Sequence, residues 1–353
     1  MGLPEVLIEF KEKATSFIQR SARGIVVLVL KDDTISQTEL KAYYSLAEVS
    51  AENWTDDNYE MIRLAFVSYP FKVMIVRLPE DAVDYSAALS ILSIKQFDYL
   101  AIPGILAGDV DVIKSWVVTE NGKNHLMRAV LPNVTAADHE CIINFTTKGI
   151  KAGEKSYTTA AYTARIAGVL AALSLSMSAT YHVLDEITEI TDHIDPNADI
   201  DAGQLILIND GEKVKIGRAV NSLVTLSKKK GKDYQKIKIV ETMHMIKKDI
   251  SSNFKDNYIG KISNGYDNKM VFIATVEAYF EDLVSEGILD PSASNTVDID
   301  VAKHLAIAKL DGEDVSVMDE AAIREYNTGT FVYLDGKCKP LDAMEDLNLG
   351  LEI

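Results

Sequence analysis

Residues 24–32 read GIVVLVLKD, and the six residues from Ile25 to Leu30 are all apolar. A strand with one face in water alternates between apolar and polar residues, whereas a strand covered on both faces reads as a continuous apolar run. A glycine precedes the run and charged residues follow it, so it has the length of a strand and not of a helix. The stretch therefore predicts a strand buried on both faces.

Helical and strand patterns alternate on the C-terminal side of this strand. Residues 55–67 show helical spacing, with Thr55 as the N-cap residue and acidic residues in the first turn. Residues 71–78 read as the next strand. The alternation continues with expected helices at 84–94 and 109–122, the second closed by Gly122, and expected strands at 97–104, 125–132 and 141–147. This rhythm is typical of an α/β layer with a largely parallel sheet.

The pattern changes after an acidic stretch at residues 185–203, which reads as a boundary or a surface loop. Asp210-Gly211 and Asp335-Gly336 each lie between apolar runs, and each predicts a β-hairpin. Further elements are expected as helices at about 240–256 and 267–286 and as a strand and a helix within 291–310. The expected fold is a mixed-sheet α/β core with packed helices and an extended strand arm at each end. Its expected parts are an N-terminal arm at 1–22, an α/β core portion at 23–195, an α+β core portion at 196–335 and a C-terminal arm at 336–353.

One expected helix, at residues 158–176, has small residues along one face. These residues are Ala160, Ala164, Ala167, Gly168 and Ala171. Small side chains let a helix lie close against another stretch of backbone. The face therefore packs either in the chain's own core or against another subunit.

The composition is that of a globular protein with an acidic excess. A net charge of −17 argues against direct binding of nucleic acid, which needs a basic surface. No apolar run approaches the roughly 20 residues that cross a bilayer, and the N-terminus has acids where a secretion signal needs bases. Two distant cysteines, Cys141 and Cys338, argue against a disulfide framework or a zinc cage. We expect a protein made in the cytoplasm, without membrane insertion.

Two stretches invite a ligand-binding interpretation, and neither has the required spacing. Residues 148–156, KGIKAGEKS, resemble a phosphate-binding loop, but Gly149 and Gly153 stand too close together and Glu154 splits the Gly-Lys pair. The alternating acids of 195–201 resemble the start of a calcium loop but lack its glycine and its final glutamate. We expect a strand–helix turn at the first stretch and a solvated loop at the second. Because the histidines are also scattered, we expect no catalytic residue, no cofactor and no metal site, and hence no enzyme.

Both ends of the chain carry a short pattern of alternating apolar residues. The apolar positions are Val6, Ile8 and Phe10 in an expected strand at 5–11, and Leu347, Leu349, Leu351 and Ile353 in an expected strand at 346–353. The two strands either pair with each other, although a lone two-stranded ribbon is marginal in water, or pair with strands of neighbouring subunits. Head-to-tail contacts of the second kind generate a helical filament when they do not close into a ring.

Five blocks of sequence, at residues 8–32, 157–171, 213–226, 258–280 and 325–353, occur in an order that resembles the contractile tail sheath proteins of phages and phage-derived particles. The resemblance covers most of the chain and is least clear between about residues 100 and 150. The chain is short for that family and resembles a nearly minimal sheath protein.

The resemblance implies both an assembly and a function. Sheath proteins stack as rings around a rigid inner tube and exchange terminal arms, so the apolar positions at the two ends are the implied strand donors. The implied joints are residues 12–23 and 336–345. The implied function is a helical sheath that a baseplate triggers to contract, which drives the tube through a target envelope. The implied partners are copies of the chain, the inner tail tube protein, and baseplate and terminator proteins, in a virion tail or a released particle such as an R-type bacteriocin.

Two other interpretations remain open on the sequence. The chain is a different self-assembling protein, such as a filament or shell subunit, if its assembly is planar or closed and does not contract. It is a nucleotide-binding enzyme on a doubly wound sheet if His, Asp and Lys side chains converge around a ligand.

Overall fold

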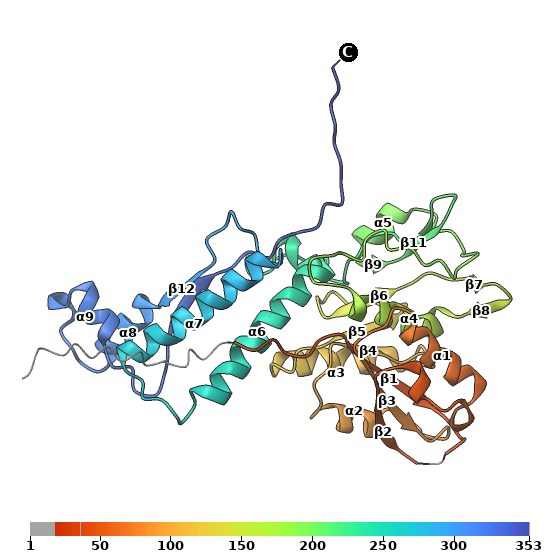
Figure 1. The fold of residues 1–353 in the computed structure, drawn as a ribbon, viewed down its shortest axis with the longest axis horizontal. Helices are drawn as coiled ribbons and strands as arrows, with labels where there is room; N and C mark the ends of the chain where they lie inside the picture. The colour runs from red at the N-terminus through yellow and green to blue at the C-terminus, as the bar shows by residue number, and fades with distance from the viewer. Residues whose placement is uncertain (1–17, 36, 353) are drawn as a thin grey trace, which may run out of the picture. The chain divides into compact units, whose positions relative to one another are not determined.

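The computed structural model describes residues 18–35 and 37–352 (Figure 1). Contacts within the chain divide it into two compact units. Of the described residues, the large unit comprises those within 21–246 together with 340–352, and the small unit comprises 247–339 together with 18–20. The expected join at 195/196 falls inside the large unit, and the expected four-part division stays a prediction.

A single mixed sheet forms the centre of the large unit, and β1 (Ile25–Lys31) lies in its interior. On its two sides β1 pairs in parallel with β3 (Lys72–Leu78) and β4 (Tyr99–Ala101). Among the described residues the strand order is β2-β3-β1-β4-β5-β6-β9, where β2 is Glu39–Tyr43, β5 Arg128–Pro132, β6 Ile142–Phe145 and β9 Gln204–Leu205. Only β2 runs antiparallel to its neighbour in this sheet, so the expected largely parallel sheet is confirmed.

Each face of this sheet carries its own hydrophobic core. Along β1, Val26, Leu28 and Leu30 belong to one core, while Ile25, Val27 and Val29 belong to the other. Successive side chains of a strand point to opposite faces, so the continuous apolar run serves both cores. The first core is covered by α1 (Asp56–Phe66) and α4 (Thr159–Ala172), and the second by α2 (Ser86–Leu92) and α3 (Val110–Gly122). The buried central strand expected at 24–32 is confirmed.

The small-residue face of α4 packs inside the chain's own core. A Cβ atom added at Gly168 would lie 2.2 Å from the carbonyl oxygen of Ala65 in α1, so no side chain fits there. Ala164, Ala167 and Ala171 are buried in the same core. The core-packing interpretation of this helix is confirmed.

Two stretches expected as a simple turn and a loop are regular structures. Most of the stretch at 148–156 belongs to a hairpin of β7 (Ile150–Ala152) and β8 (Lys155–Tyr157), which turns at Gly153 with a φ of +61°. The strand–helix turn expected there was wrong, because this glycine adopts the left-handed conformation of a tight strand turn. The expected solvated loop at 195–201 is instead a short helix, α5 (Pro196–Asp201), because Asp195 caps it and proline occupies its first position.

The two Asp-Gly dipeptides have different structures. Asp210-Gly211 connects β10 (Leu207–Asn209) to β11 (Val214–Ile216) as the expected hairpin. Asp335-Gly336, in contrast, lies inside β13 (Leu334–Lys337), which pairs antiparallel with β12 (Thr296–Ile299). The second hairpin prediction was wrong because a distant strand competes with the local turn. The glycine fits this pairing, since a Cβ at Gly336 would lie 2.9 Å from the carbonyl oxygen of Thr296.

The small unit contains α7 (Tyr266–Ser285), α8 (Val301–Leu310), α9 (Glu320–Glu325) and the β12–β13 sheet. The unit boundary at 246/247 falls within α6 (Ile237–Asn257). The two long helices expected at about 240–256 and 267–286 are thus confirmed. Short 3-10 turns occur at Leu46–Glu48, Ala51–Asn53, Lys232–Gln235 and Val315–Val317. None of the helices in the described ranges is long and apolar enough to span a membrane.

Candidate assembly site at the chain ends

The last described residues form an extended segment without a strand partner in the described part of the chain. Figure 1 draws the described residues of this terminal segment, residues 347–353, as an extended trace without helix or strand. No backbone hydrogen bond joins residues 347–352 to another described residue. Leu347, Leu349 and Leu351 are 88%, 66% and 78% exposed. Within the described part of the chain, the strand expected at 346–353 is therefore not formed by pairing with the same molecule.

The residues just before this segment are, in contrast, tied to the large unit. This arm root, residues 342–346, carries three carboxylates. Asp342 forms an ion pair with Lys236, and Asp346 accepts from Nη2 of Arg218 at 2.5 Å. Glu345 accepts hydrogen bonds from Ser178 and Thr180. The joint expected at 336–345 is thus held by several contacts near its C-terminal end, and no sequence pattern indicated their partners.

The predicted N-terminal donors, Val6, Ile8 and Phe10, lie outside the described residues, as does Ile353. The first described residues belong to the joint expected at 12–23. Ile18 is buried, and Arg20 pairs with Glu286 at 2.5 Å within the small unit. Three residues later, Arg23 pairs with Glu241 at 2.9 Å within the large unit. Both ends of this short stretch are therefore anchored by arginine.

The Arg23 contact is part of a buried charged network in the large unit. Glu241, on α6, also accepts a hydrogen bond of 3.0 Å from the hydroxyl of Tyr99. Arg128 lies 3.8 Å from Glu241 and stacks on the Tyr99 ring at 4.5 Å. Burial raises the pKa of Tyr99 well above its usual value, so the phenol stays a proton donor. The network joins the start of β1 to α6, and no sequence pattern revealed it because its members are distant along the chain.

The small unit offers a short exposed sheet. All four residues of β13 are at least partly exposed, and in β12 only Ile299 is buried. α7 packs against β12. Two-stranded sheets are marginal in water unless another element covers or extends them. The β12–β13 sheet is therefore a surface to which a further strand can add. The sequence pattern did not predict this sheet, because Asp335-Gly336 indicated a local hairpin.

Two lysines of the phosphate-loop-like stretch are paired with carboxylates. Lys155 donates to Glu60 at 2.7 Å, and Lys151 donates to Glu189 at 2.8 Å. Burial of Glu60 opposes its charge, but hydrogen bonds from Arg63, Lys155 and Tyr157 lower its pKa to about 2. These contacts hold the β7–β8 hairpin to α1 and to the loop before α5, which is a structural role.

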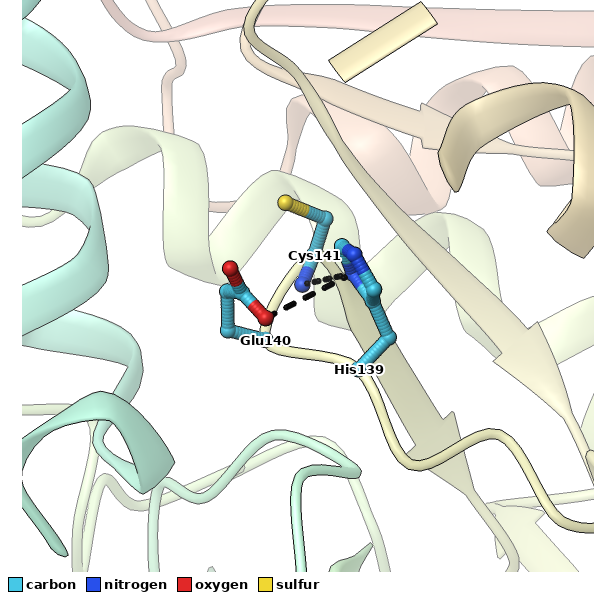
Figure 2. A group of neighbouring side chains, drawn as sticks. All are labelled: His139, Glu140 and Cys141. Carbon is cyan, nitrogen blue, oxygen red and sulfur yellow. Dashed lines mark hydrogen bonds and ion pairs between the residues drawn. The ribbon is translucent and has the colours of Figure 1, made fainter. Parts of the chain in front are cut away.

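Figure 2 shows one further cluster of polar side chains, His139, Glu140 and Cys141, between β5 and β6. Burial lowers the pKa of His139, so its neutral ring accepts the Cys141 N–H at Nδ1, 3.1 Å away. Glu140 pairs with Lys230 at 2.7 Å. The Sγ atom of Cys141 lies 3.9 Å from Nε2 of His244 on α6. The imidazole of His139 and the carboxylate of Glu140 both accept from donors of the protein itself. We therefore assign this cluster a structural role, which is to stabilise the connection between β5 and β6.

Solved structures place the fold in a class of proteins. A crystal structure of the sheath tail protein from Desulfitobacterium hafniense matches with a TM-score of 0.70 at 16% identity, covering 84% of this chain and 94% of that one. The helical sheath of the anti-feeding prophage in its contracted state matches with a TM-score of 0.69 at 12% identity, covering 100% of this chain and 99% of that one. The fold is that of a tail sheath protein.

Sequence comparison identifies the family. The family model described as the phage tail sheath C-terminal domain matches residues 229–353. The tail sheath protein of Clostridium phage phiCD119 is 37% identical over 367 aligned positions, covering 100% of this chain and 99% of that protein. The chain therefore belongs to the phage tail sheath protein family, as its ordered sequence blocks indicated. This membership favours the sheath interpretation over an unrelated filament, a shell subunit or an enzyme.

Proposed function

We propose that copies of this chain polymerise as a helical sheath around an inner tail tube, and that the sheath contracts to drive the tube through a target cell envelope. The observation that carries the proposal is the terminal segment, which has a strand pattern, exposed leucines and no strand partner in its own described chain. Strand addition supplies affinity through backbone hydrogen bonds and specificity through alternate side chains. The contact donates at one end and accepts elsewhere, so repeating it without closing a ring builds a helix.

The acceptor in this proposal is the β12–β13 sheet of another copy. Its two strands are short and exposed, and added strands give its edges the hydrogen-bond partners that a ribbon lacks. Leu347, Leu349, Leu351 and Ile353 then face one side of the enlarged sheet. The N-terminal positions Val6, Ile8 and Phe10 supply the second donor strand in the same proposal.

Contraction in this proposal is a rigid-body rearrangement of subunits that remain connected through their arms. The extended sheath is held kinetically until a baseplate releases it, so the role is structural and needs neither catalysis nor a nucleotide. Because many copies move together, each needs to contribute only a few kcal/mol, the order of one good packing change. The net charge of −17 helps to keep unassembled copies soluble.

The proposed partners follow from this role. They are other copies of the chain, the inner tube protein, and baseplate and terminator proteins, with assembly in the bacterial cytoplasm and release in a virion tail or tail-like particle. Direct contact with nucleic acid forms no part of the proposal, because the acidic excess opposes it.

Electron microscopy of the purified chain tests the proposal. The full chain is compared, with and without inner tube protein, with a variant lacking residues 347–353, which keeps the arm root. A matched control carries Asn348→Ser and Glu352→Gln, which change only the polar face of the terminal segment. We expect hollow cylinders from the full chain and the control, and folded monomers from the truncated chain. Cylinders of the same form from the truncated chain, or a full chain that stays monomeric even with the tube, would contradict it.

A further inference from the structure

The carboxylate of Glu345 is the centre of the contacts that hold the arm root. Its Oε1 atom accepts from the hydroxyls of Ser178 and Thr180, both at 2.7 Å. Its Oε2 atom lies 3.7 Å from Nε of Arg218. Three separate stretches of the large unit thus meet here: the loop after α4, the loop after β11, and the arm root itself.

The hydroxyl donors at this point are themselves oriented by the backbone. Oγ1 of Thr180 accepts the N–H of Ala219 at 3.0 Å, and Oγ of Ser178 accepts the N–H of Thr180 at 3.2 Å. A hydroxyl that accepts a fixed N–H has fewer directions left for its own hydrogen. Thr180 donates to the carboxylate, and the hydroxyl hydrogen of Ser178 has two acceptors within reach, Oε1 of Glu345 at 2.7 Å and Oγ1 of Thr180 at 3.0 Å. Hydrogen bonds to an ionised acceptor are also stronger than those between neutral groups. The site is therefore built to receive a carboxylate at one place.

Exposure changes abruptly around this site. Only 15% of the Glu345 side chain is exposed, whereas its neighbour Met344 is 103% exposed. Arg218 reaches one residue further to Asp346. From Leu347 to Glu352 the side chains are exposed, and the backbone has no partner among the described residues. The fixed part of the arm thus ends at Asp346.

We propose that Glu345 is a positioning residue for assembly. Its contacts with Ser178, Thr180 and Arg218 fix the arm root to the large unit. The terminal segment therefore leaves the large unit in one direction and changes direction only at residues 346–347. The inference rests on the proposed strand exchange and specifies how the donor strand is presented. A donor whose base is fixed loses less conformational freedom on docking than a donor on a loose linker. The turning point in this inference lies at residues 346–347, just beyond the C-terminal end of the joint expected at 336–345.

Distance measurements between two spin labels on the unassembled full chain directly test whether Glu345 fixes the arm root to the large unit. One label is placed at Met344→Cys and the other at Ile194→Cys, since these side chains are 103% and 105% exposed and both belong to the large unit. Cys338→Ser removes the exposed native thiol, and Cys141 is buried. We expect a narrow distance distribution in this parent. Glu345→Ala broadens it, and Glu345→Gln broadens it less, because the amide oxygen still accepts from the two hydroxyls but has no charge for Arg218.

A second pair of labels locates the turning point. With the first label moved from residue 344 to Asn348→Cys, we expect a broad distribution already in the parent, because the turn lies between the two positions. If the distance distribution for the label at residue 344 is equally wide in the parent and in Glu345→Ala, Glu345 does not fix the arm root. If the distribution for the label at residue 348 is as narrow as that at 344, the turning point is not at 346–347.

Polymerisation rates separate this inference from the proposed function. We expect Glu345→Ala to slow sheath formation by about tenfold, the factor that 1.4 kcal/mol gives, while Asp192→Ala, which removes an exposed charge elsewhere on the large unit, leaves the rate unchanged. The thermal unfolding of the monomer is expected to change little. If the chain lacking 347–353 polymerises normally, strand exchange is wrong. If the chain lacking 347–353 fails to polymerise but Glu345→Ala assembles at the parental rate, only the positioning role of Glu345 is wrong.

Discussion

Strand β1 and the terminal segment are both rich in aliphatic residues, but they have opposite environments. β1 is paired on both sides and buried on both faces, with Val27 and Leu28 fully buried in different cores. The terminal segment has neither a paired edge nor a covered face among the described residues. The difference follows the pattern of residues: the continuous apolar run of β1 is buried on both faces inside its own chain, whereas the alternating leucines of the terminal segment stay exposed among the described residues.

The largest expected effect of a single substitution is in the central strand. Leu28→Ala removes a fully buried side chain and leaves a cavity, so we expect a loss of about 3 kcal/mol in the free energy of unfolding. Trp54 and Trp116 are the tryptophans of the chain and both lie in the large unit, so their fluorescence in urea follows that unit. Leu106→Ala, at an exposed leucine of the same unit, serves as the control. Equal losses in the two variants would refute the assignment of β1 to the core.

A smaller effect is expected from Asp32, which directly follows β1. Burial opposes its charge, but hydrogen bonds from Thr34, Asn58 and Thr55 lower the pKa of this carboxyl to about 2. Because the folded-state pKa lies below the unfolded value, the stabilisation is present above about pH 4 and is lost as the pH falls toward 2. Its size is about 2 kcal/mol.

The pH dependence of unfolding measures this contribution. Between pH 5 and pH 2, roughly spanning the two pKa values, the parent is expected to lose more stability than Asp32→Asn, whose side chain does not titrate. Parallel stability curves for the two proteins would show that the hydrogen bonds to Asp32 do not favour its charged form.

The smallest effect on stability is expected in the terminal segment. Leu349→Ala removes as many atoms as Leu28→Ala, but from an exposed side chain, so the unfolding free energy is expected to change by less than about 0.5 kcal/mol. Polymerisation, followed by light scattering, is expected to weaken in the same variant because the apolar face of the strand is interrupted. A variant that unfolds more easily yet polymerises normally would reverse the comparison.

The elements that were predictable from sequence are those whose signals are local. The run at 24–32, the N-cap Thr55 and the Asp210-Gly211 turn each specify their structure within a few residues, and each was confirmed. Gly168 is a weaker case, because the small face of its helix left open whether the close contact lies inside the chain.

The contacts that could not be predicted join residues that are distant along the chain. Asp335-Gly336 has a strong turn signal, but pairing with β12 overrides it. The carboxylate of Glu345 meets Ser178 and Thr180 more than 160 residues earlier in the chain, and no spacing rule connects them. For the terminal segment the alternation was visible, but its partner belongs to the proposed assembly and not to the single chain.

A cryo-electron microscopy reconstruction of the polymer, at a resolution that traces the backbone, tests strand exchange most directly. We expect density for residues 347–353 to continue from the arm root and to run as a strand beside the β12–β13 sheet of another copy. A terminal segment that pairs within its own chain, or that is unpaired while core surfaces hold the lattice together, would contradict the account.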